Sequence, residues 1–223
     1  MEILPGIHRI DNVRGSNSYL TLFDESIAII DTGSPGNSKK ILTYINNLGR
    51  NPRDVKYIIL THADIDHTGN VLNLKKITGA QVAAHEYEVQ NLRGGFTHSN
   101  SKGVLGVVSR MRFLRFRPIN VDKKLKDSDE IAGLKVIYTP GHTKGSICLY
   151  HAPDALFIGD IIRINHQNNP EFSARAFTWD DTLVYQSLQK ISELSFHILL
   201  PGHGEPLFEN SIVSLKQLLQ TNS

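Results

Sequence analysis

The sequence is poor in cysteine, and this limits both its covalent and its metal chemistry. Among 223 residues there is one cysteine, Cys148. A single thiol excludes a disulfide within the chain and a metal cage built from several thiolates. Cys148 stands in the apolar segment 146–150, which is typical of a buried strand. Because free cysteine packs as a small hydrophobic residue, we predict an unreactive core thiol.

The sequence also lacks a long apolar run and a strong charge of either sign. No stretch approaches the roughly 20 apolar residues of a membrane-spanning helix, and the first residues do not resemble a signal peptide. We therefore predict a cytoplasmic protein that has no membrane partner. The formal net charge is +2. A chain this balanced has no general electrostatic attraction for nucleic acid, so we expect a small-molecule substrate instead.

Short apolar strands alternate with helical segments along most of the chain. The predicted strands cover residues 18–23, 27–30, 55–60, 80–84, 135–139, 146–151, 155–158 and 198–200. The predicted helices cover residues 38–48, 68–77, 180–194 and 210–219. Strands separated by helices in both halves indicate an α/β protein whose sheets are covered by helices. No linker divides the chain, so we predict one domain over residues 1–223.

Residues 86–121 interrupt this rhythm and are predicted to form a partly helical cap insertion. The segment is basic, and its arginines alternate with apolar residues at Arg110, Arg112, Arg115 and Arg117. One interpretation is an amphipathic cap with a solvated basic face. Another is a lip that attracts an anionic substrate, because loops beside a rigid site usually set specificity. The sequence also leaves open whether the insertion is a lid or a contact in a homodimer.

Several side chains that can bind a metal ion follow predicted strands. Directly after the strand at 55–60, four of them fall within six residues: His62, Asp64, Asp66 and His67. Histidine and carboxylate at this density match the ligands of zinc, iron or manganese, and favour a metal site over a solvated loop. Four more strands are followed by single residues of the same kind: Asp31, His142, Asp160 and His203. The last three are each preceded by glycine, which allows the backbone to turn sharply.

This ordered set resembles the five motifs of the metallo-β-lactamase superfamily, and the resemblance covers nearly the whole chain. It implies an αββα four-layer sandwich with a metal site at one edge. It assigns three ligands to a first metal site: His62, Asp64 and His142. It assigns three others to a second site: Asp66, His67 and His203. Asp160 would bridge the two sites. Asp31 would not bind metal but would orient the histidine-rich loop through hydrogen bonds.

One departure from the superfamily pattern concerns the first site. The usual residue at position 64 is histidine, and this chain has Asp64. Aspartate can still bind a metal ion, but it supplies an oxygen and a negative charge, which favour a harder ion. We therefore expect two divalent metal ions, with zinc as the first choice and with iron or manganese as alternatives.

Two metal ions in this arrangement can share a hydroxide that attacks an electrophilic carbonyl. Asp66 is the predicted catalytic residue, because its carboxylate can orient this hydroxide as well as bind metal. His85 follows a predicted strand and His166 follows Asp160 within a few residues, so both are candidates for substrate contacts. No serine or cysteine triad competes with this interpretation.

These features predict a dinuclear metal-dependent hydrolase that cleaves a small-molecule ester, thioester or lactone. The chain is similar to the compact glyoxalase-II-like and lactonase-like members of the superfamily. It stops soon after its last predicted helix, which we expect to weigh against efficient hydrolysis of glutathione thioesters. The main alternative is an iron-dependent oxidoreductase of the same fold, similar to persulfide dioxygenases, because Asp64 would suit iron. A nuclease ranks below both.

Overall fold

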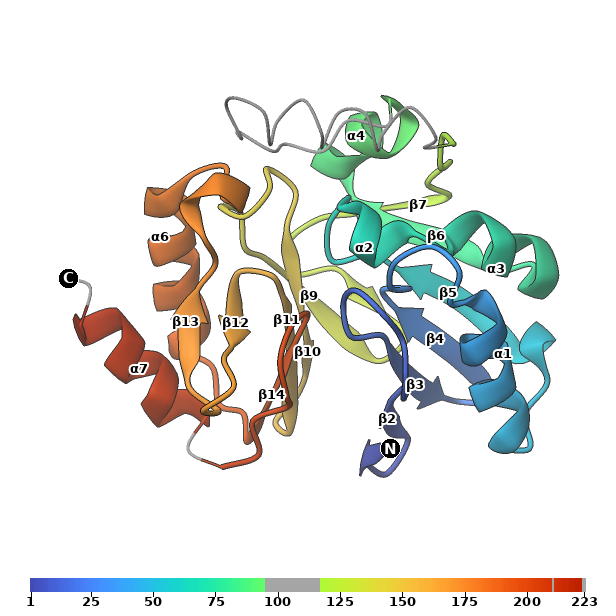
Figure 1. Cartoon of the computed structure of the whole chain (residues 1–223), viewed down its shortest axis with the longest axis horizontal. Coiled ribbons are helices and arrows are strands. Elements are labelled where there is room, and N and C mark those ends of the chain that lie inside the picture. The colour runs from blue at the N-terminus through green and yellow to red at the C-terminus, as the bar shows by residue number, and fades with distance from the viewer. Residues whose placement is uncertain (95–116, 210, 222–223) are drawn as a thin grey trace.

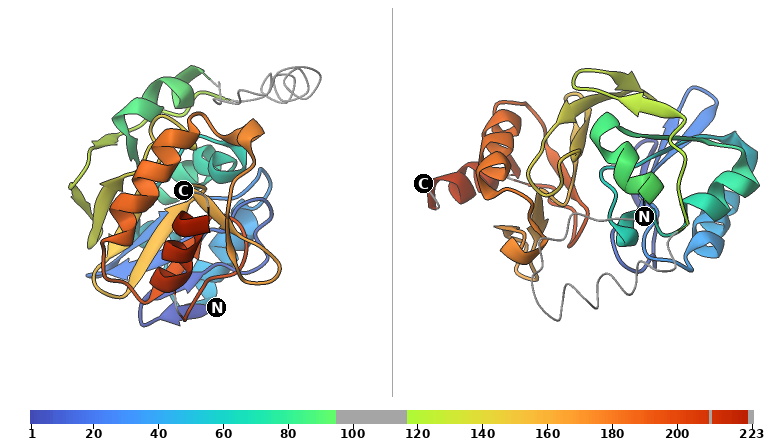
Figure 2. Two further views of the ribbon diagram at one scale, coloured as in Figure 1. Left: turned by 90° about the vertical axis from the view of Figure 1, so that its left-hand side faces the viewer. Right: turned by 90° about the horizontal axis from the view of Figure 1, so that it is seen from above.

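Two β-sheets lie face to face in the computed structural model, and helices cover their outer faces (Figure 1). The structure describes residues 1–94, 117–209 and 211–221. Seen from above, the two halves of the sandwich lie side by side, each with its own helices (Figure 2). This arrangement confirms the predicted α/β class and the αββα order of layers.

The first sheet contains seven strands in chain order: β1 (Glu2–Leu4), β2 (Ile7–Arg9), β3 (Tyr19–Phe23), β4 (Ser26–Ile30), β5 (Val55–Ile59), β6 (Gln81–His85) and β7 (Lys123–Leu125). The strands from β1 to β4 pair antiparallel, whereas those from β4 to β7 pair parallel. Helix α1 (Ser38–Asn47) joins β4 to β5, and α3 (Val71–Thr78) lies between β5 and β6. These helices are the crossovers that parallel neighbours require.

The second sheet has five strands in the order β14-β11-β10-β9-β8. Their bounds are β8 (Glu130–Ile131), β9 (Leu134–Tyr138), β10 (Ile147–His151), β11 (Ala155–Gly159) and β14 (Ile198–Pro201). Two further strands, β12 (Ile162–Ile164) and β13 (Pro170–Phe172), form a separate hairpin. Helices α6 (Asp181–Ser192) and α7 (Ser211–Thr221) cover the outer face of this half (Figure 1).

The core follows from the alternation of side chains along each strand, since successive residues point to opposite faces. In β11, Phe157 packs between the two sheets, whereas Leu156 and Ile158 pack toward the helices. Val184 and Leu188 lie one turn apart on helix α6, and both pack in the same outer layer. Cys148 of β10 is completely buried in this layer, and burial raises its thiol pKa to about 12, as expected for an unreactive core thiol.

Strand direction explains why the candidate ligands meet. Strands β4, β5 and β6 are parallel, so their carboxyl ends lie at one edge of the first sheet. In the second sheet β9 and β11 are both antiparallel to β10, and β14 is parallel to β11. These three strands therefore also end at a common edge. The residues that follow the six strand ends include Asp31, His62, His142, Asp160 and His203.

The predicted helix at residues 68–77 is wrong at its start. A short helix α2 (Ile65–Thr68) precedes α3, and Gly69 and Asn70 separate them. Gly69 is pressed against the preceding loop, where a Cβ atom would lie 2.4 Å from the backbone nitrogen of Pro35. The buried Asn70 side chain accepts a hydrogen bond from the backbone N–H of Asn37 at 2.8 Å. These contacts fix the chain between the two helices.

Six short strands were not predicted: β1, β2, β7, β8, β12 and β13. Each has two or three residues, which is too few to show a two-residue alternation. Within the predicted insertion, residues 86–94 form the 3-10 helix η2 (Glu86–Glu88) and helix α4 (Val89–Gly94). Arg117 is exposed, whereas the predicted roles of Arg110, Arg112 and Arg115 concern residues outside those described. Among the described residues, every helix is too short or too polar to span a bilayer.

Candidate metal centre

The histidine-rich segment leaves β5 and forms the single turn of α2. Asp64 precedes this turn, and its carbonyl accepts hydrogen bonds from the backbone N–H groups of His67 at 2.9 Å and Thr68 at 3.0 Å. Because α2 is only one turn long, His62, Asp64, Asp66 and His67 are all displayed from one short loop-and-turn segment. Side chains from the second sheet then complete two groups around them.

The first group contains His62, Asp64 and His142. Asp64 Oδ2 lies 3.2 Å from His142 Nε2 and 3.7 Å from His62 Nε2. The imidazole rings of His62 and His142 are nearly perpendicular, with centroids 4.7 Å apart. One ligand atom from each of the three residues lies within 4.8 Å of the other two, a spacing that one metal ion could bridge.

The second group contains Asp66, His67 and His203, and Asp160 lies between the two groups. His203 Nε2 is 3.2 Å from Asp66 Oδ2. Asp160 Oδ1 is 3.1 Å from His67 Nε2, and its Oδ2 is 3.1 Å from His203 Nε2 and 4.0 Å from His142 Nε2. Asp160 thus faces members of both groups, and the structure brings all seven predicted ligands into one cluster.

Several polar atoms of this cluster are better suited to binding a metal ion than to forming hydrogen bonds with one another. His62 Nε2, His67 Nε2 and Asp160 Oδ1 are buried and have no hydrogen-bond partner among the described residues. The short distance between His67 and Asp160 is therefore a close approach without hydrogen-bond alignment. Buried polar atoms without partners are costly. Divalent cations bound by imidazole and carboxylate would satisfy all three atoms.

Asp31 fixes the histidine-rich segment from behind. Its carboxylate accepts hydrogen bonds from the backbone N–H of Thr61 at 2.9 Å and from the Thr61 hydroxyl at 2.7 Å. Its Oδ2 also lies 2.8 Å from His67 Nδ1. On the neighbouring histidine, His62 Nδ1 lies 3.0 Å from Thr61 Oγ1. Both imidazoles are therefore held at Nδ1, which leaves their Nε2 atoms directed into the cluster.

Close opposite charges shift the pKa values of the cluster in a consistent direction. Burial alone would lower the pKa of His67, but the carboxylates of Asp160 and Asp31 outweigh it and hold this pKa well above its usual value. The pKa of His203 is likewise raised to about 9, because Asp160 and Asp66 outweigh its burial. Burial would raise the pKa of Asp160, yet His67 and His203 hold it well below its usual value. The site therefore stabilises carboxylate anions beside positive charge.

Two glycines beside the cluster are needed for close approach. At Gly202, a Cβ atom would lie 2.1 Å from Asp160 Oδ1 and 2.8 Å from His67 Cε1. At Gly159, where φ is +51°, a Cβ atom would lie 2.9 Å from Thr61 Oγ1. From the sequence, the glycines before the ligands are expected to allow sharp turns. At Gly202, crowding by the ligand side chains is the stronger reason.

Ser16 and Asn17 hold the ligand loops together, and no sequence pattern predicted this role. Ser16 donates a hydrogen bond from its hydroxyl to the carbonyl of Asp66 at 2.7 Å. Asn17 donates from Nδ2 to the carbonyls of Pro201 at 3.0 Å and Gly204 at 2.8 Å, on either side of His203. Both belong to a polar loop before β3 that carries no ligand pattern. Only the folded chain shows that this loop reaches both ligand segments.

The two predicted substrate contacts belong to neither ligand group. His85 is buried at the end of β6 and stacks on Tyr138, with ring centroids 4.4 Å apart and planes 7° apart. Its Nδ1 accepts a hydrogen bond from the backbone N–H of Tyr87, and burial lowers its pKa. His166 is exposed in the turn between β12 and β13. Contact of either residue with a substrate stays a prediction.

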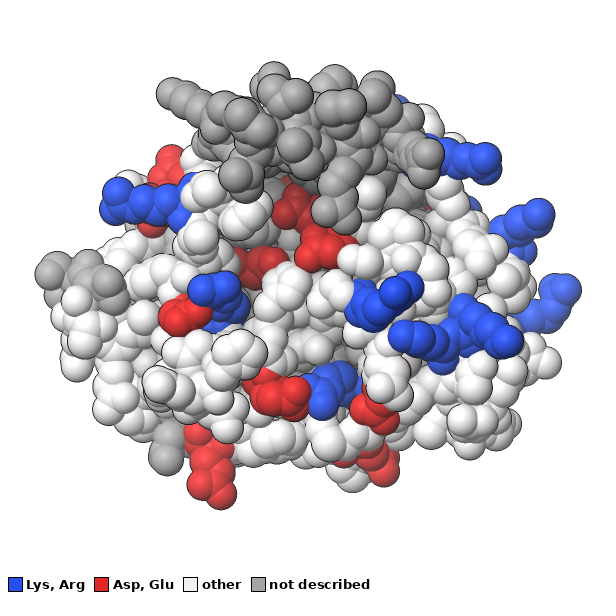
Figure 3. Space-filling model, in the orientation of Figure 1, with Lys and Arg blue, Asp and Glu red and all other residues white. Residues whose placement is uncertain are grey.

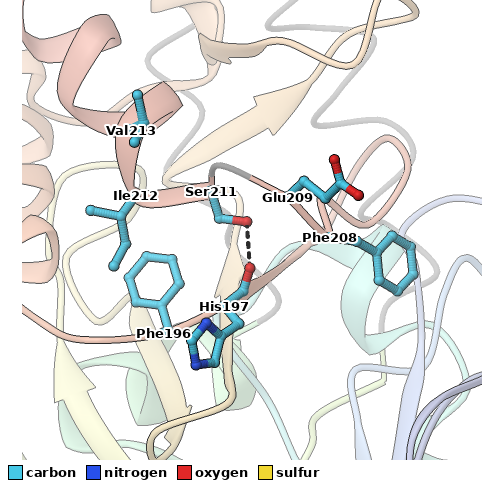
Figure 4. Close-up of a pocket in the computed structure, with 7 residues that line it drawn as sticks. All are labelled: Phe196, His197, Phe208, Glu209, Ser211, Ile212 and Val213. Carbon is cyan, nitrogen blue, oxygen red and sulfur yellow. Dashed lines mark hydrogen bonds between the residues drawn. The ribbon is translucent and has the colours of Figure 1, made fainter.

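The described surface includes several hollows in which a small molecule could be held. Figure 3 shows acidic side chains gathered in a hollow near the centre of the face seen in Figure 1. The side chains of Asp64 and Asp66 keep 26% and 34% exposure, so the cluster is accessible. A separate pocket lies between the start of β14 and the start of α7, whereas His203 follows the end of β14. Figure 4 shows its lining: Phe196, His197, Phe208, Glu209, Ser211, Ile212 and Val213.

Comparisons with known proteins identify a family for this chain. Residues 11–203 match the family model of the metallo-beta-lactamase superfamily. A probable metallo-hydrolase from Methanocaldococcus jannaschii is 29% identical over 202 residues, which cover 85% of this chain and 88% of that protein. A hydroxyacylglutathione hydrolase from Hydrogenovibrio crunogenus is 30% identical over 176 residues, which cover 73% of this chain but only 53% of that enzyme.

A solved structure gives the same result for the fold. The crystal structure of a metallo-beta-lactamase family protein from Thermus thermophilus superposes with a TM-score of 0.73 at 24% sequence identity. The superposition covers 99% of this chain and 80% of the other. The family model spans most of the sequence, and it includes every strand end that supplies a residue to the cluster. This chain therefore belongs to the metallo-β-lactamase superfamily.

Proposed function

We propose that this chain is a hydrolase that uses two divalent metal ions to cleave an ester, thioester or lactone bond in a small molecule. The observation that carries the proposal is the continuous ligand cluster, in which two three-residue groups share Asp160 between them. In the proposed assignment, His62, Asp64 and His142 hold the first ion. Asp66, His67 and His203 hold the second.

Bound at these positions, the ions would supply Lewis acidity and lower the pKa of a water molecule toward neutrality. The protein residues would orient the reaction. Among the cluster carboxylates, Asp66 is the most exposed, at 34% against 26% for Asp64 and 11% for Asp160. Asp66 is therefore best placed to accept a hydrogen bond from the attacking water on the side open to substrate. Asp31 contacts His67 Nδ1 and so fixes the orientation of this ligand of the second group.

The similarity to proteins named as hydrolases supports the reaction class. One relative is a probable metallo-hydrolase and another is a hydroxyacylglutathione hydrolase. Acyl transfer to water also matches the site, because a carbonyl substrate needs an electrophilic centre beside an oriented water. Zinc is the metal that we propose first, since imidazole ligands predominate in the cluster.

A second candidate is an iron-dependent oxidoreductase built on the same cluster. The observation that favours it is Asp64, whose Oδ2 faces both His62 and His142 at 3.7 Å and 3.2 Å. An oxygen ligand at this position makes the first site harder and more suitable for iron or manganese than a site of imidazoles alone.

Metal analysis of protein purified without chelators or added metal separates the two proposals. About two equivalents of zinc per chain, together with hydrolysis in a panel of esters, thioesters and lactones, would support the hydrolase. Iron with substrate-dependent oxygen uptake would support the oxidoreductase instead. Protein that cannot be loaded with any divalent ion would refute both.

A matched control keeps this experiment specific to the cluster. His151 is a half-exposed histidine at the end of β10, which runs opposite to β9 and β11, so it lies at the far edge of the sheet. Metal content and activity should survive His151→Ala. They should be lost together in His67→Ala.

A further inference from the structure

Glu88 is a completely buried carboxylate that belongs to none of the ligand groups. It ends η2, three residues after the last residue of β6, and its side chain has 0% exposure. The neighbouring helix α4 lies at the end of the molecule where the strand-end loops meet (Figure 1). Acidic side chains are almost never fully buried unless they are paired or hydrogen-bonded. The partners of Glu88 therefore indicate what it holds in place.

Two of its partners belong to the loop that carries His142. Glu88 Oε1 accepts hydrogen bonds from the Thr143 hydroxyl at 2.5 Å and from the backbone N–H of Gly145 at 2.9 Å. Its Oε2 accepts a hydrogen bond from Asn91 Nδ2 at 2.9 Å, which fixes the carboxylate from the side of α4. The fit is tight, because a Cβ atom at Gly145 would lie 2.7 Å from Glu88 Cγ.

The loop itself continues this network up to the ligand. The backbone N–H of Thr143 donates to Ser146 Oγ at 3.0 Å, and the two hydroxyls lie 2.7 Å apart. On the opposite side of the ligand, the backbone N–H of Trp179 donates to the carbonyls of Gly141 at 2.9 Å and His142 at 3.0 Å. His142 is thus held between the segment before α6 and the buried carboxylate of Glu88.

His142 depends on this loop more than the other buried histidines do. The outer nitrogens of His62 and His67 are fixed by Thr61 and Asp31. In contrast, His142 Nδ1 is buried and has no hydrogen-bond partner among the residues that the structure describes. Histidine ligands usually gain their orientation from a hydrogen bond at the second ring nitrogen. For His142, the backbone of its loop must supply that orientation.

We propose that Glu88 is a positioning residue of the first metal site, because its buried carboxylate fixes the His142 loop through Thr143 and Gly145. This inference rests on the proposed function, in which His142 binds the first ion. Glu88 lies at the start of the predicted insertion, so the inference links that segment directly to the first metal site. The second site, held by residues from other loops, is outside this link.

Stepwise zinc binding to metal-free protein, followed by competition with a chromophoric chelator, tests the proposal. The wild-type protein should show two steps, and the step that disappears in His142→Ala reports the first site. Glu88→Ala should weaken that step by about 10- to 100-fold, the usual effect of removing a group that orients a ligand. The other step should change less than about twofold.

Conservative variants separate positioning from general damage. Glu88→Gln fills the same space, and its amide oxygen can still accept from Thr143 and Gly145, so it should recover most of the lost affinity. Thr143→Val keeps the shape but removes the hydroxyl that donates to Glu88 and contacts Ser146, which gives a second test if Glu88→Ala does not fold. Glu86→Ala is the matched control, because Glu86 lies on the same 3-10 helix but its carboxylate is partly exposed and lies 3.7 Å from the exposed Lys126.

The outcomes distinguish this inference from the proposed function. Two results would overturn the role of Glu88: equal weakening of both zinc steps by Glu88→Ala and Thr143→Val, or no weakening by either variant. The proposed function would stand in both cases if the wild-type protein binds two ions. A Glu88→Gln variant that binds no better than Glu88→Ala would also overturn it. If wild-type protein binds fewer than two ions, the proposed function fails and the inference fails with it.

Discussion

Asp31 and His67 form a buried pair in which the Asp31 carboxylate lies 2.8 Å from His67 Nδ1. Both side chains are almost fully buried, with 3% and 0% exposure. The same carboxylate accepts two hydrogen bonds from Thr61, which precedes His62. One side chain therefore orients one histidine directly and the other through its neighbour, and both Nε2 atoms face the cluster.

Replacement of Asp31 by asparagine should weaken metal binding without breaking the fold. The backbone at Asp31 has φ of +54°, a conformation that asparagine tolerates. Asparagine keeps only one acceptor oxygen, so it loses either the hydrogen bond that the Thr61 N–H donates to Oδ1 or those that the Thr61 hydroxyl and His67 Nδ1 make with Oδ2. We expect about 10- to 100-fold weaker zinc affinity by chelator competition. Asp24→Asn is the control, since Asp24 is exposed and has φ of +46°. Equal affinities in both variants would contradict the role of Asp31.

Replacement of Asp64 by histidine should shift the metal preference toward zinc. The change substitutes a borderline imidazole nitrogen for a hard carboxylate oxygen, 3.2 Å from His142 Nε2. Competition between zinc and manganese for metal-free protein should therefore favour zinc by about tenfold more in Asp64→His than in wild type. Asp64→Asn keeps the size but removes the charge, and it should weaken the binding of both metals. An unchanged metal ratio in Asp64→His would show that position 64 does not contact the ion.

The sequence predicted the layers and the gathering of ligands because both depend on local patterns. Apolar runs such as residues 27–30 and 155–158 are short, nearly continuous and followed by a ligand type, so strands and strand ends could be recognised together. Each sheet gathers its ligand-bearing strand ends at one edge, and the face-to-face packing of the two sheets places His142 near His62 although the two lie 80 positions apart in the sequence. Apart from the start of α3, the predicted bounds differ from the observed ones by at most two residues, as is common where helix ends fray.

The supporting polar residues could not be predicted, because their burial depends on distant parts of the chain. Glu88 lies in a segment that begins the predicted basic insertion, where an acidic side chain normally indicates a solvated surface. Asn70 lies in a stretch that the helical pattern assigned to one continuous helix. In both cases, decisive partners are more than 30 residues away in sequence. Composition and periodicity contain no signal for such pairs.

Replacement of Asn70 by alanine should destabilise the protein strongly. Asn70 is buried, accepts hydrogen bonds from the backbone N–H groups of Gly36, Asn37 and Ser38, and donates to the carbonyl of Thr32 at 2.7 Å. Truncation leaves these groups without partners, and each buried unsatisfied group costs about 1–3 kcal/mol. We expect the free energy of unfolding in urea to fall by about 3 kcal/mol or more.

A surface asparagine provides the comparison for this variant. Asn46 is exposed on α1, so Asn46→Ala should change the free energy of unfolding by less than about 0.5 kcal/mol. A loss for Asn70→Ala within that same range would mean that water or a rearranged loop replaces the hydrogen bonds of the Asn70 side chain.

The stability of metal-free protein should fall as pH rises from 6.5 to about 9. The pKa of His203 is raised from 6.5 to about 9, and those of His67 and His142 are raised as well, because the cluster carboxylates outweigh burial. A histidine whose pKa is higher in the folded state than in the unfolded state stabilises the fold. This stabilisation is complete below the unfolded-state pKa and is lost as pH rises through the folded-state pKa. The carboxylates Asp64 and Asp160 have lowered pKa values and stay ionised throughout this range, so they add no opposing slope.

Thermal unfolding of chelator-treated protein at pH 6.5, 8 and 9 checks this expectation. The Tm should decline across the series, and it should decline less in His203→Ala, which lacks one of the raised groups. Zinc-loaded protein should behave in the opposite way, because metal ions bind deprotonated imidazole and therefore bind more tightly as pH rises. A Tm of metal-free wild-type protein that stays level or increases over this range would show that the carboxylates do not hold protons on the cluster histidines.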